Sequence, residues 1–220
     1  GKVDFKGLLV DQRMDVVFHL ASITDTTEHD QFLQLNHNVE DFRHLLKWAS
    51  EDQTPVVYAS SAATYGQTDE IMVESKVPSP QNVYAFSKVQ MDNLASQYAR
   101  QFPAWKLVGL KFFNVYGPRE PIKGEYAPVI GLFKRQIQSK EFVTVVSPGE
   151  QRRDFTYIDD VVEANICAMN SSIKNIPHAI YNVGTGKNYS IIEVANMLDP
   201  GSSGVKKITL VPARLAEVNE

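Results

Sequence analysis

The chain has 220 residues, of which 43% are apolar, and 22 basic against 26 acidic side chains give it a formal charge of -4. This composition supports one sizeable core with at most a small second lobe, and the sequence has no basic cluster of the kind that binds nucleic acid. The single cysteine excludes an intrachain disulfide, and the five histidines show no metal-ligand spacing, so no metal site is expected. Because no apolar run reaches membrane-spanning length, we expect a cytoplasmic protein without a membrane partner.

The first half of the chain alternates between short apolar runs and amphipathic stretches. Apolar runs rich in Val and Phe predict buried strands at residues 15–22, 55–61 and 106–117. Helices are predicted between them, at residues 36–50 and from about 82 to 101. The apolar face of the first of these helices comprises Val39, Phe42, Leu45 and Leu46. Strands that alternate with helices predict a parallel sheet covered by helices on both faces.

The second half is more irregular. Helices are predicted at residues 127–137, 159–172 and 190–198, and strands at 142–146 and 207–211. These elements indicate a smaller lobe that covers ligands at the carboxyl ends of the parallel strands.

Two of these helices begin with residues that favour a helix start. Asp159 or Asp160 is predicted as the N-cap of one helix, because a carboxylate can accept from the unpaired N–H groups of the first turn. Ser190 followed by Glu193 predicts a capping box at the start of the other.

The segment "PQNVYAFSKVQMD" places Tyr84 four residues before Lys88, so both side chains share one face of the long helix. A free tyrosine, with a pKa of about 10, is a poor base at neutral pH. A nearby ammonium group favours the phenolate and lowers that pKa. Tyr84 could then take the proton of an alcohol, while a hydroxyl from the preceding strand holds the substrate.

Small residues end the two strands before this helix, and they would let a flat ligand lie against the backbone. They are Ala21, Ser22, Ala59, Ser60 and Ser61. Close packing of a helix on the strands would favour the same residue types, so this feature acquires meaning only together with Tyr84 and Lys88.

The joint pattern resembles the extended short-chain dehydrogenase/reductase family, and within it the nucleotide-sugar epimerases and dehydratases. The matching segments, in order, are "DVVFHLAS", "SSAATYG", the Tyr84–Lys88 pair, "LKFFNVYGPRE" and "RRDFTYIDDVVEAN". The resemblance implies NAD or NADP as cofactor, Ser61 as the substrate-holding hydroxyl with Ser60 as the alternative, and Asn38 as a brace of the active site. The cofactor-contacting residues it implies are Ala21, Ser22, Asn38, Ala59, Ser60, Tyr84 and Lys88.

For the substrate, the resemblance implies a nucleotide-diphospho-sugar. Asn114 matches a residue that contacts the sugar or diphosphate, and Arg153 matches one that grips the diphosphate. Arg214 with Glu217 resembles the pair that holds diphosphate and ribose. Arginine suits this task because its guanidinium meets phosphate oxygens two at a time.

The fold class that follows is α/β, a Rossmann-like doubly wound parallel sheet with a smaller α/β substrate lobe. Residues 1–120 are predicted to form a partial dinucleotide-binding domain, and 121–220 mostly the substrate lobe, with returns to the first sheet near 142–185. No Gly-x-x-Gly-x-x-Gly turn precedes the strands, and "GTGK" at 184–187 lacks its spacing. We therefore expect the N-terminal strands of the sheet to lie outside this sequence, and these residues alone to bind the cofactor weakly.

The segment "GPREPIKG", with "TDTTEHD", looks most like the ADP-glycero-manno-heptose 6-epimerases. In those enzymes a lysine at the position of Lys123 faces the sugar from the side opposite the tyrosine and acts as a second base. This sequence departs from them at Glu125, where a small hydroxyl residue is expected, and at Leu132, where a histidine is expected. "GEYAPVI" is also similar to UDP-hexose 4-epimerases, so UDP-glucose or UDP-N-acetylglucosamine stays an alternative substrate.

Two further alternatives are a dehydratase or reductase of the same family and a non-catalytic member. Ala62 and Ala63 stand where dehydratases place an acid pair, which argues against the first. The intact Ser61, Tyr84 and Lys88 argue against the second. The resemblance also implies a homo-oligomer paired through long helices, one of them the helix that carries Tyr84.

Overall fold

A computed structural model shows the chain as two compact units, Gly1–Phe112 with Val162–Val183, and Phe113–Val161 with Gly184–Glu220. The residues that it describes are 14–26, 28, 30–120, 128–139, 142–171, 178–198 and 208–212.

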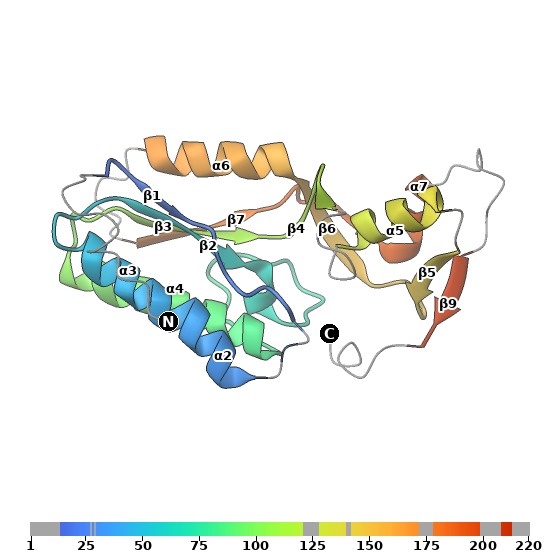
Figure 1. Cartoon of the computed structure of the whole chain (residues 1–220), viewed down its shortest axis with the longest axis horizontal. Coiled ribbons are helices and arrows are strands. Elements are labelled where there is room, and N and C mark those ends of the chain that lie inside the picture. The colour runs from blue at the N-terminus through green and yellow to red at the C-terminus, as the bar shows by residue number, and fades with distance from the viewer. Residues whose placement is uncertain are drawn as a thin grey trace. The chain divides into compact units, whose positions relative to one another are not determined.

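The first unit is built on a parallel sheet in the order β1-β2-β3-β7 (Figure 1). Its strands are β1 Val17–His19, β2 Val56–Ser61, β3 Leu107–Phe112 and β7 His178–Val183. All residues of β2 and all but the last residue of β3 are buried, as expected for strands covered on both faces. The carboxyl ends of β1, β2 and β3 therefore lie at one edge of the sheet.

Helices cover both faces of this sheet, which is the predicted doubly wound arrangement. In Figure 1, α3 and α4 lie on one face and α6 lies on the other. The helical segments are α2 Gln31–Leu35, the π-helical turn η1 Asn36–Glu40, α3 Asp41–Ala49, the 3-10 turn η2 Ala62–Tyr65, α4 Val83–Gln101 and α6 Ile158–Asn170. The helix predicted at 36–50 begins earlier, since Asp30 accepts a hydrogen bond from the Leu33 N–H at 3.0 Å and caps α2.

The core of the first unit lies between the sheet and the α3–α4 face. The predicted apolar face of residues 36–50 is confirmed, because Val39, Phe42, Leu45 and Leu46 are all buried in this cluster. Phe42 stacks against His19 on one side and packs against Tyr58 on the other, with ring centroids 5.0 and 4.9 Å apart.

In its described residues, the second unit contains two small sheets and two helices. One sheet has the order β4-β6-β8, and in the other β5 pairs with β9 in parallel. The elements are β4 Asn114–Tyr116, α5 Val129–Gln138, β5 Val143–Val146, β6 Arg152–Tyr157, β8 Asn188–Ser190, α7 Ile191–Leu198 and β9 Ile208–Val211. The strand predicted over 106–117 is thus two strands, β3 in the first unit and β4 in the second.

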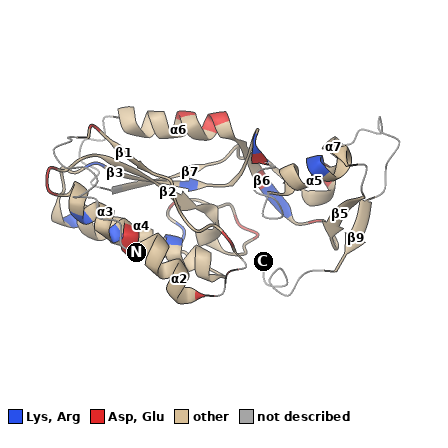
Figure 2. Cartoon of the chain, viewed as in Figure 1, with Lys and Arg blue, Asp and Glu red and all other residues tan. Residues whose placement is uncertain are grey.

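The two predicted helix starts have different outcomes. The capping box is confirmed, because Ser190 Oγ accepts from the Glu193 N–H at 3.1 Å and Glu193 Oε2 accepts from the Ser190 N–H at 2.7 Å. The N-cap at Asp159 or Asp160 is wrong, because α6 begins at Ile158 and both carboxylates lie in its first turn. There they still favour the helix, since acidic side chains near the N-terminus complement the helix dipole (Figure 2).

Candidate functional site

The end of β2 and the first turn of α4 bring Ser61 and Tyr84 together. Ser61 is the last residue of β2, and its Oγ accepts from the Ala63 N–H at 3.2 Å where the chain turns into η2. Asn82 caps α4 by accepting from the Ala85 N–H at 2.8 Å, which places Tyr84 in the first turn. The Tyr84 and Ser61 side chains hydrogen-bond to each other. An acid/base tyrosine and a substrate-holding serine need to lie this close together to reach the same substrate oxygen.

Lys88 lies one helical turn further along α4, on the same side. Its side chain is buried, its Nζ donates to the Ala59 carbonyl at 2.9 Å, and it stands 5.8 Å from the centroid of the Tyr84 ring. Burial lowers the pKa of Lys88 to about 8, against the opposing effect of the Asp92 carboxylate. The predicted trio of Ser61, Tyr84 and Lys88 is therefore gathered at one end of the sheet.

One electrostatic expectation differs from the structure. The sequence predicts that Lys88 lowers the pKa of Tyr84, yet burial raises the pKa of Tyr84, and the hydrogen bond from Ser61 opposes that effect. The physical reason is that the loss of water around a phenolate disfavours its charge. In addition, the Lys88 ammonium group donates its hydrogen bond to the Ala59 carbonyl and not to the phenol.

The alternative serine, Ser60, faces the other side of β2 from Ser61. Its hydroxyl donates to Asp92 Oδ2 at 2.9 Å, and the residue is 2% exposed. Because Asp92 takes the Ser60 hydroxyl and the Ser61 side chain hydrogen-bonds to Tyr84, the hydroxyl that meets Tyr84 is that of Ser61.

Asn38 ties the segment after β1 to α4. Its Oδ1 accepts from the Ile23 N–H at 2.8 Å, and its Nδ2 lies 3.0 Å from the Ile23 carbonyl and 2.9 Å from Ser87 Oγ. Ser87 in turn donates to the Tyr84 carbonyl at 2.7 Å, and Gln34 Oε1 lies 2.9 Å from the same Asn38 Nδ2. Asn38 thus braces the first turn of α4, and no motif in the sequence indicates Gln34 or Ser87.

The carboxyl end of β1 fits a bound ligand with polar atoms. Ala21 is exposed there, and within the described ranges the buried Ser22 Oγ and His19 Nε2 have no hydrogen-bond partner. A buried hydroxyl without a partner is costly unless a ligand or water supplies one. Together with Ala59 at the end of β2, these residues fit the dinucleotide that the sequence predicts.

Two of the predicted substrate residues lie in the second unit. Asn114 begins β4, where its Nδ2 donates to the Asp154 carbonyl at 3.0 Å, and Arg153 lies on β6, where its Nη1 donates to the Arg152 carbonyl at 3.1 Å. Leu132 packs against the core of this unit. The remaining predicted residues, Lys123, Arg214 and Glu217, lie outside the described residues, as does Glu125.

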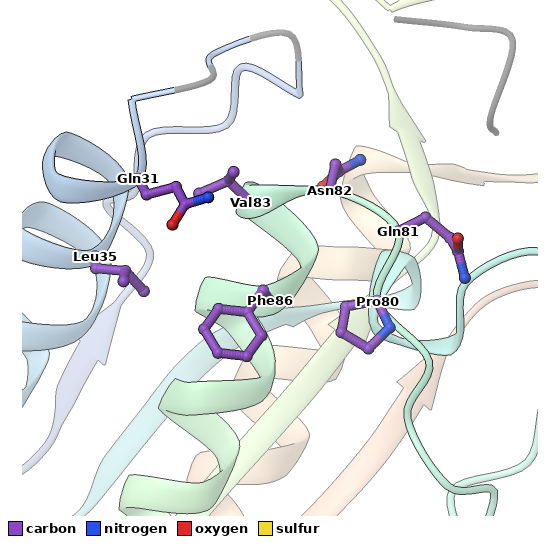
Figure 3. A pocket seen from close by; sticks show the side chains of 7 residues that line it. All are labelled: Gln31, Leu35, Pro80, Gln81, Asn82, Val83 and Phe86. Atoms are coloured by element: carbon purple, nitrogen blue, oxygen red, sulfur yellow. The ribbon is translucent and has the colours of Figure 1, made fainter.

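A groove of about 390 Å³ lies beside the start of α4 (Figure 3). It is lined by Gln31, Leu35, Pro80, Gln81, Asn82, Val83 and Phe86. In the part of the chain that the structure describes, none of the predicted site residues lines this groove, so it is separate from the trio of Ser61, Tyr84 and Lys88.

The described residues carry neither a metal cluster nor a membrane-spanning helix. Within the described ranges, no group of three or more His, Cys, Asp or Glu side chains is placed to hold a metal ion. Among the helices described, none has the length and apolar character needed to cross a membrane.

Comparison with known proteins places these residues in context. The family model of the NAD dependent epimerase/dehydratase family matches residues 2–184. ADP-L-glycero-D-manno-heptose-6-epimerase of Alkalilimnicola ehrlichii is 36% identical over 180 residues, which cover 79% of this chain and 55% of that protein. The chain therefore spans about half the length of this curated relative.

Solved structures show the same fold. The ADP-L-glycero-D-manno-heptose-6-epimerase of Helicobacter pylori aligns with a TM-score of 0.78 at 38% identity, over 91% of this chain and 62% of that one. UDP-glucose 4-epimerase from Thermotoga maritima aligns with a TM-score of 0.84 at 26% identity, over 93% of this chain and 66% of that one. The predicted α/β class with a Rossmann-like parallel sheet is confirmed. By its sequence match and its fold, the chain belongs to the NAD dependent epimerase/dehydratase family.

Proposed function

We propose that the protein is a nicotinamide-dependent epimerase of a nucleotide-diphospho-sugar and that its substrate resembles ADP-glycero-manno-heptose. The hydrogen bond between Tyr84 and Ser61, with Lys88 one turn behind, is the observation that carries the proposal. Similarity to two ADP-L-glycero-D-manno-heptose-6-epimerases, at 36% and 38% identity, supports the choice of sugar.

The residues divide the chemistry between them. Ser61 holds the reacting hydroxyl group, and Tyr84 takes its proton and later returns it, so that the carbinol is oxidised to a ketone and reduced again. Ala21, Ser22, Asn38 and the end of β2 would hold NAD or NADP, whose chemistry would be to accept a hydride from the carbinol carbon and to give it back on the opposite face. The pKa of Tyr84 is raised in the structure. A positive charge on a ligand bound beside the phenol would lower this pKa again, because it would stabilise the phenolate.

For the substrate, we propose that Asn114, Arg153 and the Arg214–Glu217 pair bind the sugar and its diphosphate. We also propose Lys123 as a second base on the opposite side of the sugar. In this scheme, the domain division predicted from the sequence assigns cofactor binding to residues 1–120 and substrate binding mostly to residues 121–220. The predicted cytoplasmic location and homo-oligomeric state stay predictions.

A UDP-hexose 4-epimerase is the second candidate. It is favoured by the TM-score of 0.84 to the Thermotoga maritima UDP-glucose 4-epimerase, which exceeds the 0.78 to the heptose enzyme. In this scheme Tyr84 performs all proton transfer, and Lys123 has no part in the chemistry.

One experiment separates the candidates. The purified full-length protein is incubated with NAD or NADP and, in parallel, ADP-glycero-manno-heptose, UDP-glucose or UDP-N-acetylglucosamine, and epimers are followed by proton NMR. Tyr84→Phe should abolish turnover, whereas Tyr98→Phe, on the same helix and packed edge-on against Trp105, should retain it. Equal turnover by the Tyr84→Phe variant and the wild type would refute the proposed role of the phenol.

Lys123→Ala then distinguishes the two chemical schemes. With two bases, the variant should lose heptose epimerisation, because one stereochemical orientation of the carbinol is left without a proton acceptor. Unchanged turnover of the heptose would remove the second base from the mechanism and favour the single-tyrosine scheme.

A further inference from the structure

Three hydrogen bonds attach α4 to successive residues of β2. The Tyr58 hydroxyl donates to Asp92 Oδ1, the Lys88 Nζ donates to the Ala59 carbonyl, and the Ser60 hydroxyl donates to Asp92 Oδ2, each at 2.9 Å. Asp92 and Lys88 are four residues apart, so they project from one face of the helix. A slide of the helix along the strand would break all three bonds at once.

The next contact in this series is the one between Ser61 and Tyr84. Ser61 follows Ser60 on β2, and Tyr84 precedes Lys88 by one helical turn on α4. The anchoring at Asp92 and Lys88 therefore fixes which part of α4 meets the end of β2, and with it the placement of the Tyr84 phenol beside the Ser61 hydroxyl.

The same carboxylate is an unusual buried charge. Asp92 is 7% exposed, and two buried lysines act on it, Lys88 from its own helix and Lys111 from β3. Lys111 is opposite Ser60 in the β2–β3 register, and its Nζ lies 4.1 Å from the centroid of the Tyr65 ring. A buried carboxylate is tolerated only when hydrogen bonds and opposite charges compensate for lost water, and here two hydroxyls and two ammonium groups do so.

We propose that Asp92 is a positioning residue of the active site, which sets the register of α4 on β2 and keeps a positive charge on Lys88. The inference deepens the proposed function and rests on it for its catalytic consequence. The charged group that acts on Lys88 is Asp92 on its own helix; Lys88 itself acts on His19 from β1, and Tyr84 lies one turn away. Asp92 supplies the negative charge in this set, which opposes the loss of the Lys88 proton.

The decisive variant is Asp92→Asn, which keeps the shape of the side chain and removes its charge. The titration of Lys88 is followed by carbon–proton NMR of the lysine Cε groups, with the signal assigned by its absence in Lys88→Met. In the wild type the midpoint should lie at about 8. In Asp92→Asn it should fall by about one pH unit, because an opposite charge nearby stabilises the ammonium form by roughly that amount or more.

Tyr58→Phe is the matched control. It removes one of the hydrogen bonds to Asp92 but leaves the carboxylate in place, so the Lys88 midpoint should stay at its wild-type value. A fall of equal size in both variants would mean that packing, and not the charge of Asp92, controls Lys88, and would overturn the inference.

Lys111→Met keeps the inference testable if Asp92→Asn fails to fold. Without the Lys111 ammonium group, Lys88 is the remaining cation that acts on Asp92, so the midpoint of the Lys88 titration should rise. A midpoint that does not rise in this variant, or does not fall in a folded Asp92→Asn protein, overturns the inference.

Turnover gives the second readout. Asp92→Asn should lower kcat more than it raises KM, and the pH dependence of kcat should shift in parallel with the Lys88 titration, with partial rescue by Asp92→Glu. A protein that epimerises none of the three nucleotide sugars would refute the proposed function, while the NMR titration would still decide the role of Asp92. Normal epimerisation with an unshifted titration would refute the role of Asp92 and leave the function standing.

Discussion

His19 should make the folded protein sensitive to acid, and His19→Phe should remove that sensitivity. The imidazole lies on β1 and stacks on Phe42, with ring centroids 5.0 Å apart and an interplanar angle of 18°. Burial and, to a smaller extent, the nearby Lys88 cation lower the pKa of His19 from its ordinary 6.5 to about 4, against the opposing effect of Asp41. Phenylalanine keeps a ring against Phe42 and cannot take a proton.

The magnitude follows from proton linkage. Because the folded chain binds this proton less readily than the unfolded chain, the full stability is present above pH 6.5 and declines as the pH falls toward about 4. The difference between the His19 pKa values of the unfolded and folded chains corresponds to about 3 kcal/mol of unfolding free energy. About 2 kcal/mol of this should be lost by about pH 4.5.

Urea denaturation of the wild type and His19→Phe at about pH 7 and about pH 4.5 measures this loss. Other titrating groups contribute to both proteins, so the difference between the two losses isolates His19. The wild type should lose about 2 kcal/mol more than the variant on acidification. Equal losses would refute the reasoning. Lys88→Met should reduce the loss in part, because removing the cation raises the pKa of His19.

Three further substitutions test the structure around the site and in the second unit. Gly109→Ala should destabilise the protein by about 1–3 kcal/mol in urea, because the new Cβ would lie 2.6 Å from the Tyr58 hydroxyl; an unchanged midpoint would contradict this packing. Gly66→Ala should cost at least about 1 kcal/mol, since Gly66 has a φ of +67° and its Cβ would lie 1.9 Å from the Ser79 carbonyl oxygen, and thermal unfolding should show it. Ser190→Ala should cost about 1 kcal/mol by breaking the capping box of α7, and a Tm equal to that of the wild type would argue against that cap.

The sequence by itself determined the features that depend on local periodicity. The apolar spacing of Val39, Phe42, Leu45 and Leu46 predicts a buried helix face because neighbours on one side of a helix recur every three or four residues. The same geometry places Tyr84 and Lys88 on one side of α4. The capping box of α7 was also evident, because it is a bond between two residues of the same turn.

Elements made by pairing between distant segments were less evident. Strands β6 and β8 went unpredicted because their stability comes from pairing with each other and with β4, and the segment "RRDFTY" carries no apolar alternation. The break between β3 and β4 likewise follows from which strand each one joins, β2 and β7 in one unit and β6 in the other.

The electrostatics of the site were decided by tertiary structure alone. Sequence spacing places a cation near Tyr84, but it does not reveal that burial raises the pKa of the phenol and lowers that of Lys88. Nor does it reveal that Asp92, four residues after Lys88, accepts hydrogen bonds from the hydroxyl groups of Tyr58 and Ser60 on β2. The reason is physical: the free energy of a charge depends on the water it has lost and on the groups that replace that water, and in a folded chain those groups come from distant parts of the sequence.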